Sequence, residues 1–229
     1  MAKGNKVREA DDEIEHRGRP ENPGGEHEGE GPGGRRIDPP GQDDNDHSQR
    51  PETPPGLMGD QTLEGTAEAD EIEGGKGADS LSGGEGDDRL KGEKGADTLD
   101  GGAGDDTLGG GKGAHDLTGG EGNDSFLIDG SARSEDGLDR ILDFADGDRL
   151  VFDDGAVAGE DNFATATATD FADALAQATA LVEGGSEYVA VQVGEDVIVF
   201  ATEEGEAEVD SAVILVGRTL TDVGFGDIG

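Results

Sequence analysis

From residue 56 to residue 127 the chain reads GLMGDQTLE (56–64), GTAEADEIE (65–73), GGKGADSLS (74–82), GGEGDDRLK (83–91), GEKGADTLD (92–100), GGAGDDTLG (101–109), GGKGAHDLT (110–118) and GGEGNDSFL (119–127). The eight blocks keep one nine-residue period, G-G-x-G-x-D-x-U-x, in which U is a large apolar residue. A flexible Gly/Asp linker is the alternative, but a linker does not keep an apolar residue in register through eight units. The period therefore predicts a stacked repeat fold.

The residue types at each place indicate how one unit folds. Glycine at places one, two and four permits the positive φ angles of a tight turn, and such a turn presents backbone carbonyls inward. The last three residues are expected to form a very short strand, with the eighth side chain pointing to the interior. The eighth place is filled by Leu63, Ile72, Leu81, Leu90, Leu99, Leu108, Leu117 and Phe126.

This nonapeptide resembles the calcium-binding repeat of the RTX (repeats-in-toxin, hemolysin-type) family. The resemblance implies an all-β fold, a parallel β-roll with two nonapeptides per turn, in which a calcium ion lies between loops stacked every eighteen residues. Calcium suits such a place because it takes six to eight oxygen ligands, both carbonyl and carboxylate. The resemblance implies these ligand residues in the roll: Asp70, Gly75, Gly77, Asp79, Gly84, Gly86, Asp88, Gly95, Asp97, Gly102, Gly104, Asp106, Gly120, Gly122 and Asp124.

Two nonapeptides per turn would place alternate sixth-place residues on opposite sides of the roll. One side carries only carboxylates: Asp70, Asp88, Asp106 and Asp124. The other side is mixed: Gln61, Asp79, Asp97 and His115. An imidazole is a poor ligand for a hard cation, so His115 should interrupt its side. Thr66 and Glu68 stand where glycines belong and weaken the first site on the carboxylate side, which leaves about three to five calcium ions in the roll.

The segment 128–229 is expected to be a small β-rich cap with one helix. Residues 139–152 indicate strand, turn, strand; residues 170–183 indicate an amphipathic helix capped by Thr169 or Asp170 and ended by Gly184. A hairpin is expected from 188–193 and 197–201, and a further strand at 212–216. Such a cap would cover the open end of a solenoid.

The pattern D-x-I-x-D-F-x-x-G-D-x-L at 139–150 resembles the stretch that follows RTX repeats. By that resemblance Asp143 and Asp148, with Asp139, are expected to hold a further calcium ion. The alternative is an ordinary polar turn before a strand. The stretch 211–220 is similar to the ends of RTX proteins that type I machinery exports, which implies an uncleaved export signal in roughly the last fifty residues.

Composition limits the partners. Apolar residues make up 31% of the 229 residues and the net charge is −39, near the range of disordered chains. The net charge is −6 in 1–55, −13 in 56–127 and −20 in 128–229. This balance argues against nucleic acid or an anionic membrane and favours cations. The chain has no cysteine, and no apolar stretch long enough to span a membrane occurs in it.

Residues 1–55 are expected to be a disordered acidic tail rich in Gly and Pro. Its histidines (His16, His27 and His47) could bind metal or could be merely solvated, and their spacing matches no ligand pattern. DDNDHS at 43–48 lacks the glycine and glutamate of an EF-hand loop. The first 30 residues contain no apolar core of a Sec-type signal peptide.

The sequence favours a protein without a catalytic domain. It contains no H-E-x-x-H, no G-x-S-x-G and no cysteine nucleophile, and GGGKG at 109–113 lacks the rest of a P-loop. We therefore expect a secreted, extracellular calcium-binding protein that folds when it binds Ca2+ outside the cell, with type I secretion machinery as a partner. The alternatives are a calcium-dependent binding module for acidic polysaccharide or a cell surface, and a partner or antimicrobial role for the tail.

Overall fold

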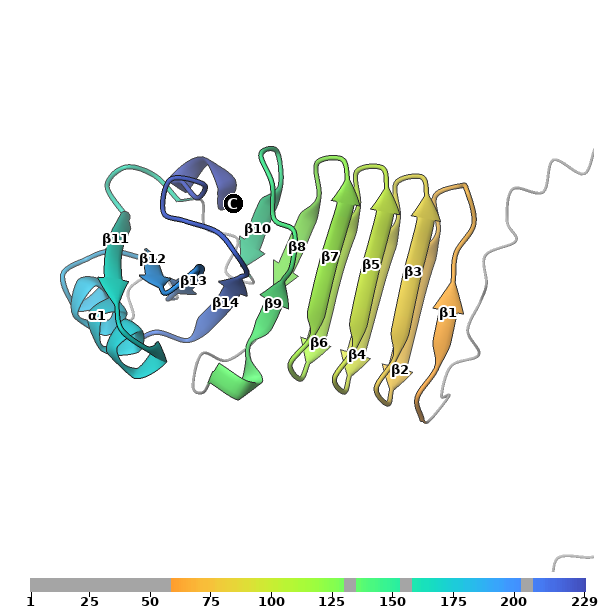
Figure 1. Cartoon of the computed structure of the whole chain (residues 1–229), viewed down its shortest axis with the longest axis horizontal. Helices are drawn as coiled ribbons and strands as arrows, with labels where there is room; N and C mark the ends of the chain where they lie inside the picture. Colours follow the sequence, from red (N-terminus) through yellow and green to blue (C-terminus); the bar gives the residue numbers. More distant parts are fainter. Residues whose placement is uncertain (1–58, 130–134, 153–157, 203–207) are drawn as a thin grey trace, which may run out of the picture. The chain divides into compact units, whose positions relative to one another are not determined.

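The computed structural model describes residues 59–129, 135–152, 158–202 and 208–229. The tail 1–55 lies outside these residues, so its disorder stays a prediction. The described parts form two β-sheets and one α-helix (Figure 1).

Ten strands form the roll, and successive units alternate between the two sheets. One sheet contains β2 (Glu71–Lys76), β4 (Arg89–Lys94), β6 (Thr107–Lys112), β8 (Ser125–Ile128) and β10 (Arg149–Phe152). The other begins with β1 (Thr62–Glu64), β3 (Ser80–Glu85), β5 (Thr98–Ala103), β7 (Asp116–Glu121) and β9 (Asp139–Ile141). All neighbours within the roll pair in parallel. The parallel β-roll expected from the sequence is therefore confirmed.

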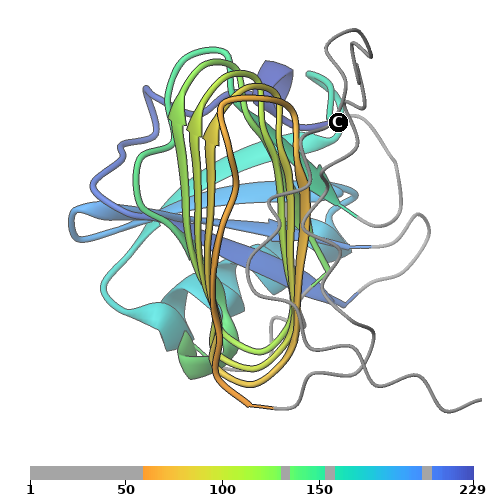
Figure 2. The same cartoon turned by 90° about the vertical axis from the view of Figure 1, so that its right-hand side faces the viewer.

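The eighth-place residues fill the space between the two sheets, which face each other in Figure 2. Leu81 lies opposite Leu99, and Leu90 opposite Leu108, so equal residues stack from turn to turn. From Ile72 to Phe126 these side chains are at most 2% exposed. Because each turn adds one apolar residue to each sheet, the nine-residue period builds one continuous core.

The strands are longer than the sequence suggested. Each complete unit contributes a strand of six residues, such as Ser80–Glu85, and not three. The strand continues because the glycines of places one and two stay in the ladder, where Gly84 pairs with Gly102. Only the three residues that follow, such as 86–88, form the turn.

The roll continues beyond the regular repeat. Six residues interrupt the period after 127, and then β9 pairs with β7 and β10 pairs with β8. Ile141 lies opposite Leu117, and Leu150 opposite Phe126, so both occupy eighth places. The strand, turn and strand expected in 139–152 are present, but they lie in different sheets.

The remaining elements extend the odd-numbered sheet beyond β9, in the order β14, β13, β12, β11. These are β11 (Phe163–Ala168), α1 (Phe171–Glu183), β12 (Tyr188–Val193), β13 (Asp196–Ala201) and β14 (Ser211–Leu215), with short 3-10 helices η1 (Glu135–Gly137) and η2 (Phe225–Asp227). The helix, the hairpin β12–β13 and the strand β14 confirm the sequence expectations, whereas β11 was not expected.

Helix α1 covers one face of this part of the sheet. The side chain of Asp170 caps its first turn by accepting from the Asp173 amide, and Gly184 follows its last residue. Ala174, Ala178 and Val182 are buried in a second apolar cluster that also contains Phe200 and Ile214. None of the helices in the described ranges is long and apolar enough to cross a membrane.

Candidate metal centre

The sixth-place side chains form two columns at the two ends of the strands. In Figure 1 the loops after β3, β5 and β7 run along the upper edge, and those after β2, β4 and β6 along the lower edge. We call the residues in these loops the upper column (Asp70, Asp88, Asp106 and Asp124) and the lower column (Asp79, Asp97, His115 and Asp139).

The carboxylates of the columns join successive turns of the roll. In each of them except Asp70, one oxygen accepts a hydrogen bond from the sixth-place amide of the turn before it. Asp88 accepts from Asp70 at 2.7 Å, Asp106 from Asp88 at 2.7 Å, and Asp97 from Asp79 at 2.8 Å. Each of these bonds spans eighteen residues, which is two nonapeptides.

The second carboxylate oxygen is the unusual feature of these columns. Among the described residues six aspartates bury an Oδ2 atom that has no hydrogen-bond partner: Asp79, Asp88, Asp97, Asp106, Asp124 and Asp139. A buried charged oxygen without a partner is costly, because it has lost water and gained nothing in return. Each of these atoms is therefore a candidate ligand for a cation.

The pKa values of several column carboxylates show that burial disfavours their charged form. Burial raises the pKa of Asp88 and of Asp124 to about 6, and the pKa of Asp139 to about 7. Burial also raises the pKa of Asp97 and Asp106. A bound cation would act in the opposite direction, because it favours the ionised carboxylate.

Backbone carbonyls supply further oxygens between the stacked loops. A Cβ placed on Gly102 would lie 2.1 Å from the Gly84 oxygen, and one on Gly104 would lie 2.2 Å from the Gly86 oxygen. The carbonyls of places two and four therefore point from one loop toward the next. The other expected ligand glycines repeat these positions: Gly75, Gly77, Gly95, Gly120 and Gly122.

The donor set decides which cation fits. Among the described side chains no cluster of three or more His, Cys, Asp or Glu residues could hold a metal ion by itself. A cation between two loops would therefore depend on carbonyl oxygens together with the carboxylates. Hard cations with many oxygen ligands and flexible geometry, calcium above all, match this set.

The first glycine of each unit has a different role from the one expected. Places two and four do adopt positive φ, but Gly83 at place one does not. Instead, a Cβ on Gly83 would lie 2.2 Å from the Oδ2 atom of Asp88. Place one therefore needs glycine for room, because the buried carboxylate lies against its Cα atom. The same contact recurs at Gly74, Gly92, Gly101 and Gly119.

Two of the expected ligand residues, Asp143 and Asp148, have protein partners for both oxygens, and Asp70 has two partners on one oxygen. Asp70 Oδ2 accepts from the amide and hydroxyl of Thr66. Asp148 accepts from the amides of Asp124 and Ala145, at 2.9 and 2.8 Å. Asp143 accepts from the amides of Gly119 and Gly120, at 3.0 and 2.9 Å, beside the point where β9 has ended.

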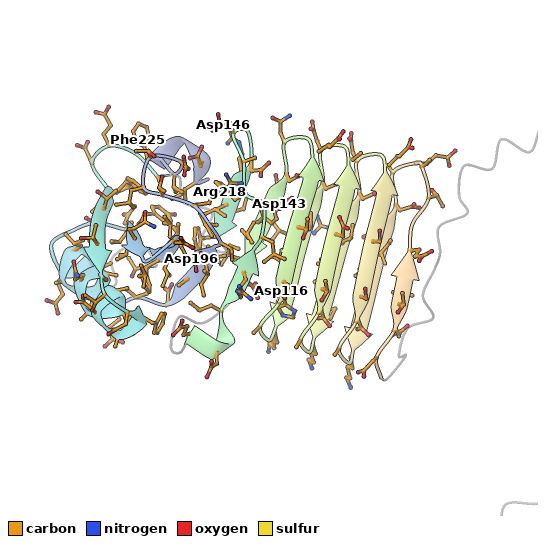
Figure 3. The ribbon with its side chains drawn as sticks, in the orientation of Figure 1. Asp116, Asp143, Asp146, Asp196, Arg218 and Phe225 are labelled. Atoms are coloured by element: carbon orange, nitrogen blue, oxygen red, sulfur yellow. The ribbon has the colours of Figure 1, made fainter. Side chains whose placement is uncertain are left out.

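Asp143 also lies at the junction with the last segment of the chain. Figure 3 shows Arg218 beside it, and Arg218 donates to the Asp143 carbonyl at 2.9 Å. The carboxylate of Asp143 thus accepts hydrogen bonds from β7, and its backbone carbonyl accepts one from the Arg218 side chain. These contacts give Asp143 a structural part in closing the roll.

Asp139 was expected to act with Asp143 and Asp148, but the structure places it in the lower column as a sixth-place residue. Its Oδ1 atom accepts from the His115 amide at 3.1 Å across a separation of 24 residues, eighteen plus the six of the interruption. It is 3% exposed, and its Oδ2 atom has no partner. The pattern Gly137-x-Asp139-x-Ile141 repeats places four, six and eight and was the signal that could have identified this position.

His115 takes the place of a carboxylate in the lower column. Its Nδ1 atom accepts from the Asp97 amide at 3.1 Å and lies 3.2 Å from Asp97 Oδ2. Burial lowers its pKa, and its Nε2 atom is buried without a partner. The ring fills the loop: a Cβ on Gly110 would lie 2.3 Å from Cδ2, and one on Gly113 would lie 3.1 Å from Cε1.

Replacing His115 by aspartate is expected to add about one bound calcium ion per chain. The shorter carboxylate would restore the oxygen that the neighbouring positions have and would vacate the space between Gly110 and Gly113. Equilibrium dialysis of wild-type protein and H115D against labelled calcium measures the stoichiometry. H115N, which restores the size but not the charge, is the control, and an equal stoichiometry in all three proteins would contradict the expectation.

Comparison with known proteins bears directly on the repeat. A family model described as the RTX calcium-binding nonapeptide repeat (4 copies) matches residues 55–90 and 82–114. No curated protein was matched by the sequence.

Solved structures with a similar arrangement include two subunits of the Azotobacter vinelandii mannuronan C5-epimerase. AlgE6R3 is 22% identical, with 79% of this chain and 82% of that chain covered and a TM-score of 0.45; AlgE6R2 is 22% identical, with 72% and 90% covered and a TM-score of 0.33. The extracellular lipase LipA from Serratia marcescens is 16% identical, with 76% and 40% covered and a TM-score of 0.28.

The nine-residue period, the parallel roll and the buried carboxylate columns agree with the family model that matches the same segment. Residues 55–114 are thus similar to the RTX calcium-binding nonapeptide repeat.

Proposed function

We propose that this chain is a secreted, non-catalytic calcium-binding protein whose roll folds when Ca2+ binds outside the cell. The observation that carries the proposal is the set of buried Oδ2 atoms that have no protein partner, in stacked loops whose carbonyls point into the same gaps. Calcium is the cation for which such an oxygen set is suited. The calcium-binding family of the repeat supports the same choice of ion.

Within this proposal the upper column binds more calcium than the lower column. Asp88, Asp106 and Asp124 each offer one oxygen without a partner, whereas Thr66 already occupies Asp70. The lower column offers Asp79 and Asp97 before His115 interrupts it. The carbonyls of places two and four would complete each coordination shell.

Replacing Asp106 by asparagine tests the assignment of the ions to these columns. Asp106 lies between two other carboxylates of its column, so D106N is expected to bind at least one calcium ion fewer per chain. Asp100 has the same charge but an exposed side chain on β5, so D100N should keep the wild-type stoichiometry. Equal loss in both variants would show that general negative charge, and not the column, binds the ions.

Secretion follows from the coupling between metal binding and folding. A chain that needs millimolar calcium to fold stays unfolded where free calcium is scarce and folds after export. We propose that residues 180–229 direct export by type I machinery. Fused to a passenger protein in a bacterium that expresses such an exporter, this segment should bring the passenger into the medium. Retention of the passenger, while the exporter's own substrate signal is exported in parallel, would contradict this part of the proposal.

A second candidate function is calcium-dependent binding of acidic polysaccharide. One observation favours it: all five basic residues of the segment 56–127 lie on β2, β4 and β6, in the same sheet. These strands also carry Glu71, Glu73 and Glu93, so five basic and three acidic residues give them a local net charge of +2 in a chain of net charge −39. Binding of an acidic glycan, measured in calcium and in chelator, separates this function from calcium-dependent folding alone.

A further inference from the structure

The two loop edges of the roll differ in charge. The turns after β3, β5 and β7 present Asp87 and Asp105 at their tips, beside Glu85 and Glu121 at the strand ends. The turns after β2, β4 and β6 present alanine, and each of these strands ends in a lysine. A β-roll places these two sets of turns at opposite ends of the strands, as Figure 1 shows.

The three strand-end lysines form a regular row, which we call the lysine edge (Lys76, Lys94 and Lys112). Lys76 lies opposite Lys94, and Lys94 opposite Lys112, in the parallel register of the sheet. All three side chains are exposed. Adjacent strands are about 4.8 Å apart, so the three ammonium groups repeat along the roll axis at about this interval.

Equal charges at this spacing repel each other, and an anion lying along the row would relieve that repulsion. Neighbouring positions on the same sheet show the usual arrangement, in which charges pair: Lys91 forms a salt bridge with Glu93. The turns after β2, β4 and β6 carry Gly and Ala at their exposed positions, and the carboxylates in them, Asp79 and Asp97, are buried. One exposed carboxylate, Asp60, lies at the Lys76 end of the row, where it accepts from the Ala78 amide. The lysine edge is therefore a narrow cationic strip with one acidic residue at its first end.

Resting on the proposed polysaccharide-binding function, we propose that the lysine edge binds a linear glycan that carries one carboxylate on each sugar residue. Such a polymer carries one negative charge per pyranose ring along an extended chain. A chain lying across β2, β4 and β6 would bring several of its carboxylates within reach of the flexible lysine side chains. Calcium contributes indirectly, because it holds the loops that set the spacing.

Other anionic partners fit this edge less well. A second copy of the chain could offer its opposite edge, where Asp87 and Asp105 are exposed. The row of lysines spans only about 10 Å, however, and a stable dimer buries about 800 Å² on each partner. Single-stranded nucleic acid is bound through stacking on aromatic side chains, whereas the turns of this edge present glycine and alanine. Anionic membranes are recognised by clusters of about four to eight basic residues, whereas the lysine edge consists of Lys76, Lys94 and Lys112.

The experiment compares two variants that lose the same charge. K76Q/K94Q/K112Q removes the lysine edge, and R89Q/R140Q/R149Q removes three exposed arginines outside it. A short oligogalacturonate is titrated into each protein in saturating calcium by calorimetry. Its methyl ester, which has the same backbone without charge, and a single-stranded oligonucleotide of equal charge are titrated in parallel. Circular dichroism verifies that each variant folds with calcium.

The wild-type protein and the arginine variant are expected to bind the oligogalacturonate, and the lysine variant to bind it at least about tenfold more weakly. The methyl ester should not bind. Equal affinity in the lysine variant would overturn the inference, and so would equal or tighter binding of the oligonucleotide. Absence of glycan binding in wild-type protein that folds normally with calcium would overturn the inference and the polysaccharide function together, but not calcium-dependent folding. Glycan binding that is unchanged in the lysine variant would overturn only the assignment of the glycan to the lysine edge, and the polysaccharide-binding function would remain.

Discussion

Excess chelator is expected to abolish most of the far-UV strand signal of this protein, and added calcium is expected to restore it. Without a cation, six buried carboxylate oxygens among the described residues have no partner, and several of the carboxylates have a raised pKa because burial disfavours their charge. The stabilisation from the one apolar core between the sheets is small compared with the conformational entropy that is lost when a segment so rich in glycine becomes ordered. Metal binding should therefore supply much of the free energy of folding.

Circular dichroism during a calcium titration measures this effect, and hydrogen exchange localises it. Amides in β2 to β8 should exchange rapidly in chelator and become protected in calcium, because every one of these strands adjoins a loop of the columns. Magnesium is the control: it demands a smaller octahedral site and should restore little signal at the same concentration. Strand signal that persists in excess chelator would refute calcium-dependent folding.

Replacing Gly95 by alanine is expected to destabilise the calcium-loaded roll by more than about 4 kcal/mol. The new Cβ atom would lie 1.6 Å from the Gly77 carbonyl oxygen, which is a backbone atom of the preceding turn. The clash can be relieved only if two stacked loops separate, and separation would also disturb the oxygens between them. Urea unfolding in saturating calcium, followed by circular dichroism, measures the loss.

Gly217 provides the matched control, because it also has a positive φ (67°) but a Cβ atom added to it would have nothing within 4 Å. G217A should therefore cost only the strain of the left-handed backbone, about 1–2 kcal/mol. If both variants lost the same stability, backbone strain and not close stacking would explain the need for glycine at place four.

The fold of the repeat was predictable because its period is local. A residue at the eighth place needs only its equivalents eighteen residues away to build the core, so the sequence shows which side chains are buried without any knowledge of the rest. The alternation of units also predicted that Asp79 and Asp97 share a column with His115. The strand length was wrong, because sequence patterns associate glycine with turns, whereas in the roll two glycines per unit remain in the ladder.

Asp139 and Asp143 show why the site was harder to predict than the fold. An interruption of six residues concealed that Asp139 continues a column, because sequence spacing no longer equals spatial spacing. Asp143 belongs to a motif that the sequence associates with calcium, yet its carboxylate accepts two backbone amides. Which buried oxygen has a partner depends on atoms that come from elsewhere in the chain, and no local pattern contains that information.

The nine-residue period by itself determined the roll, its apolar core and the two unequal carboxylate columns, because each depends only on residues that repeat at a fixed interval. The tertiary structure decided where the roll ends and which carboxylate oxygens have no partner. These features depend on how turns stack and on how the roll meets the following strands. They result from contacts between distant residues, which the sequence does not display.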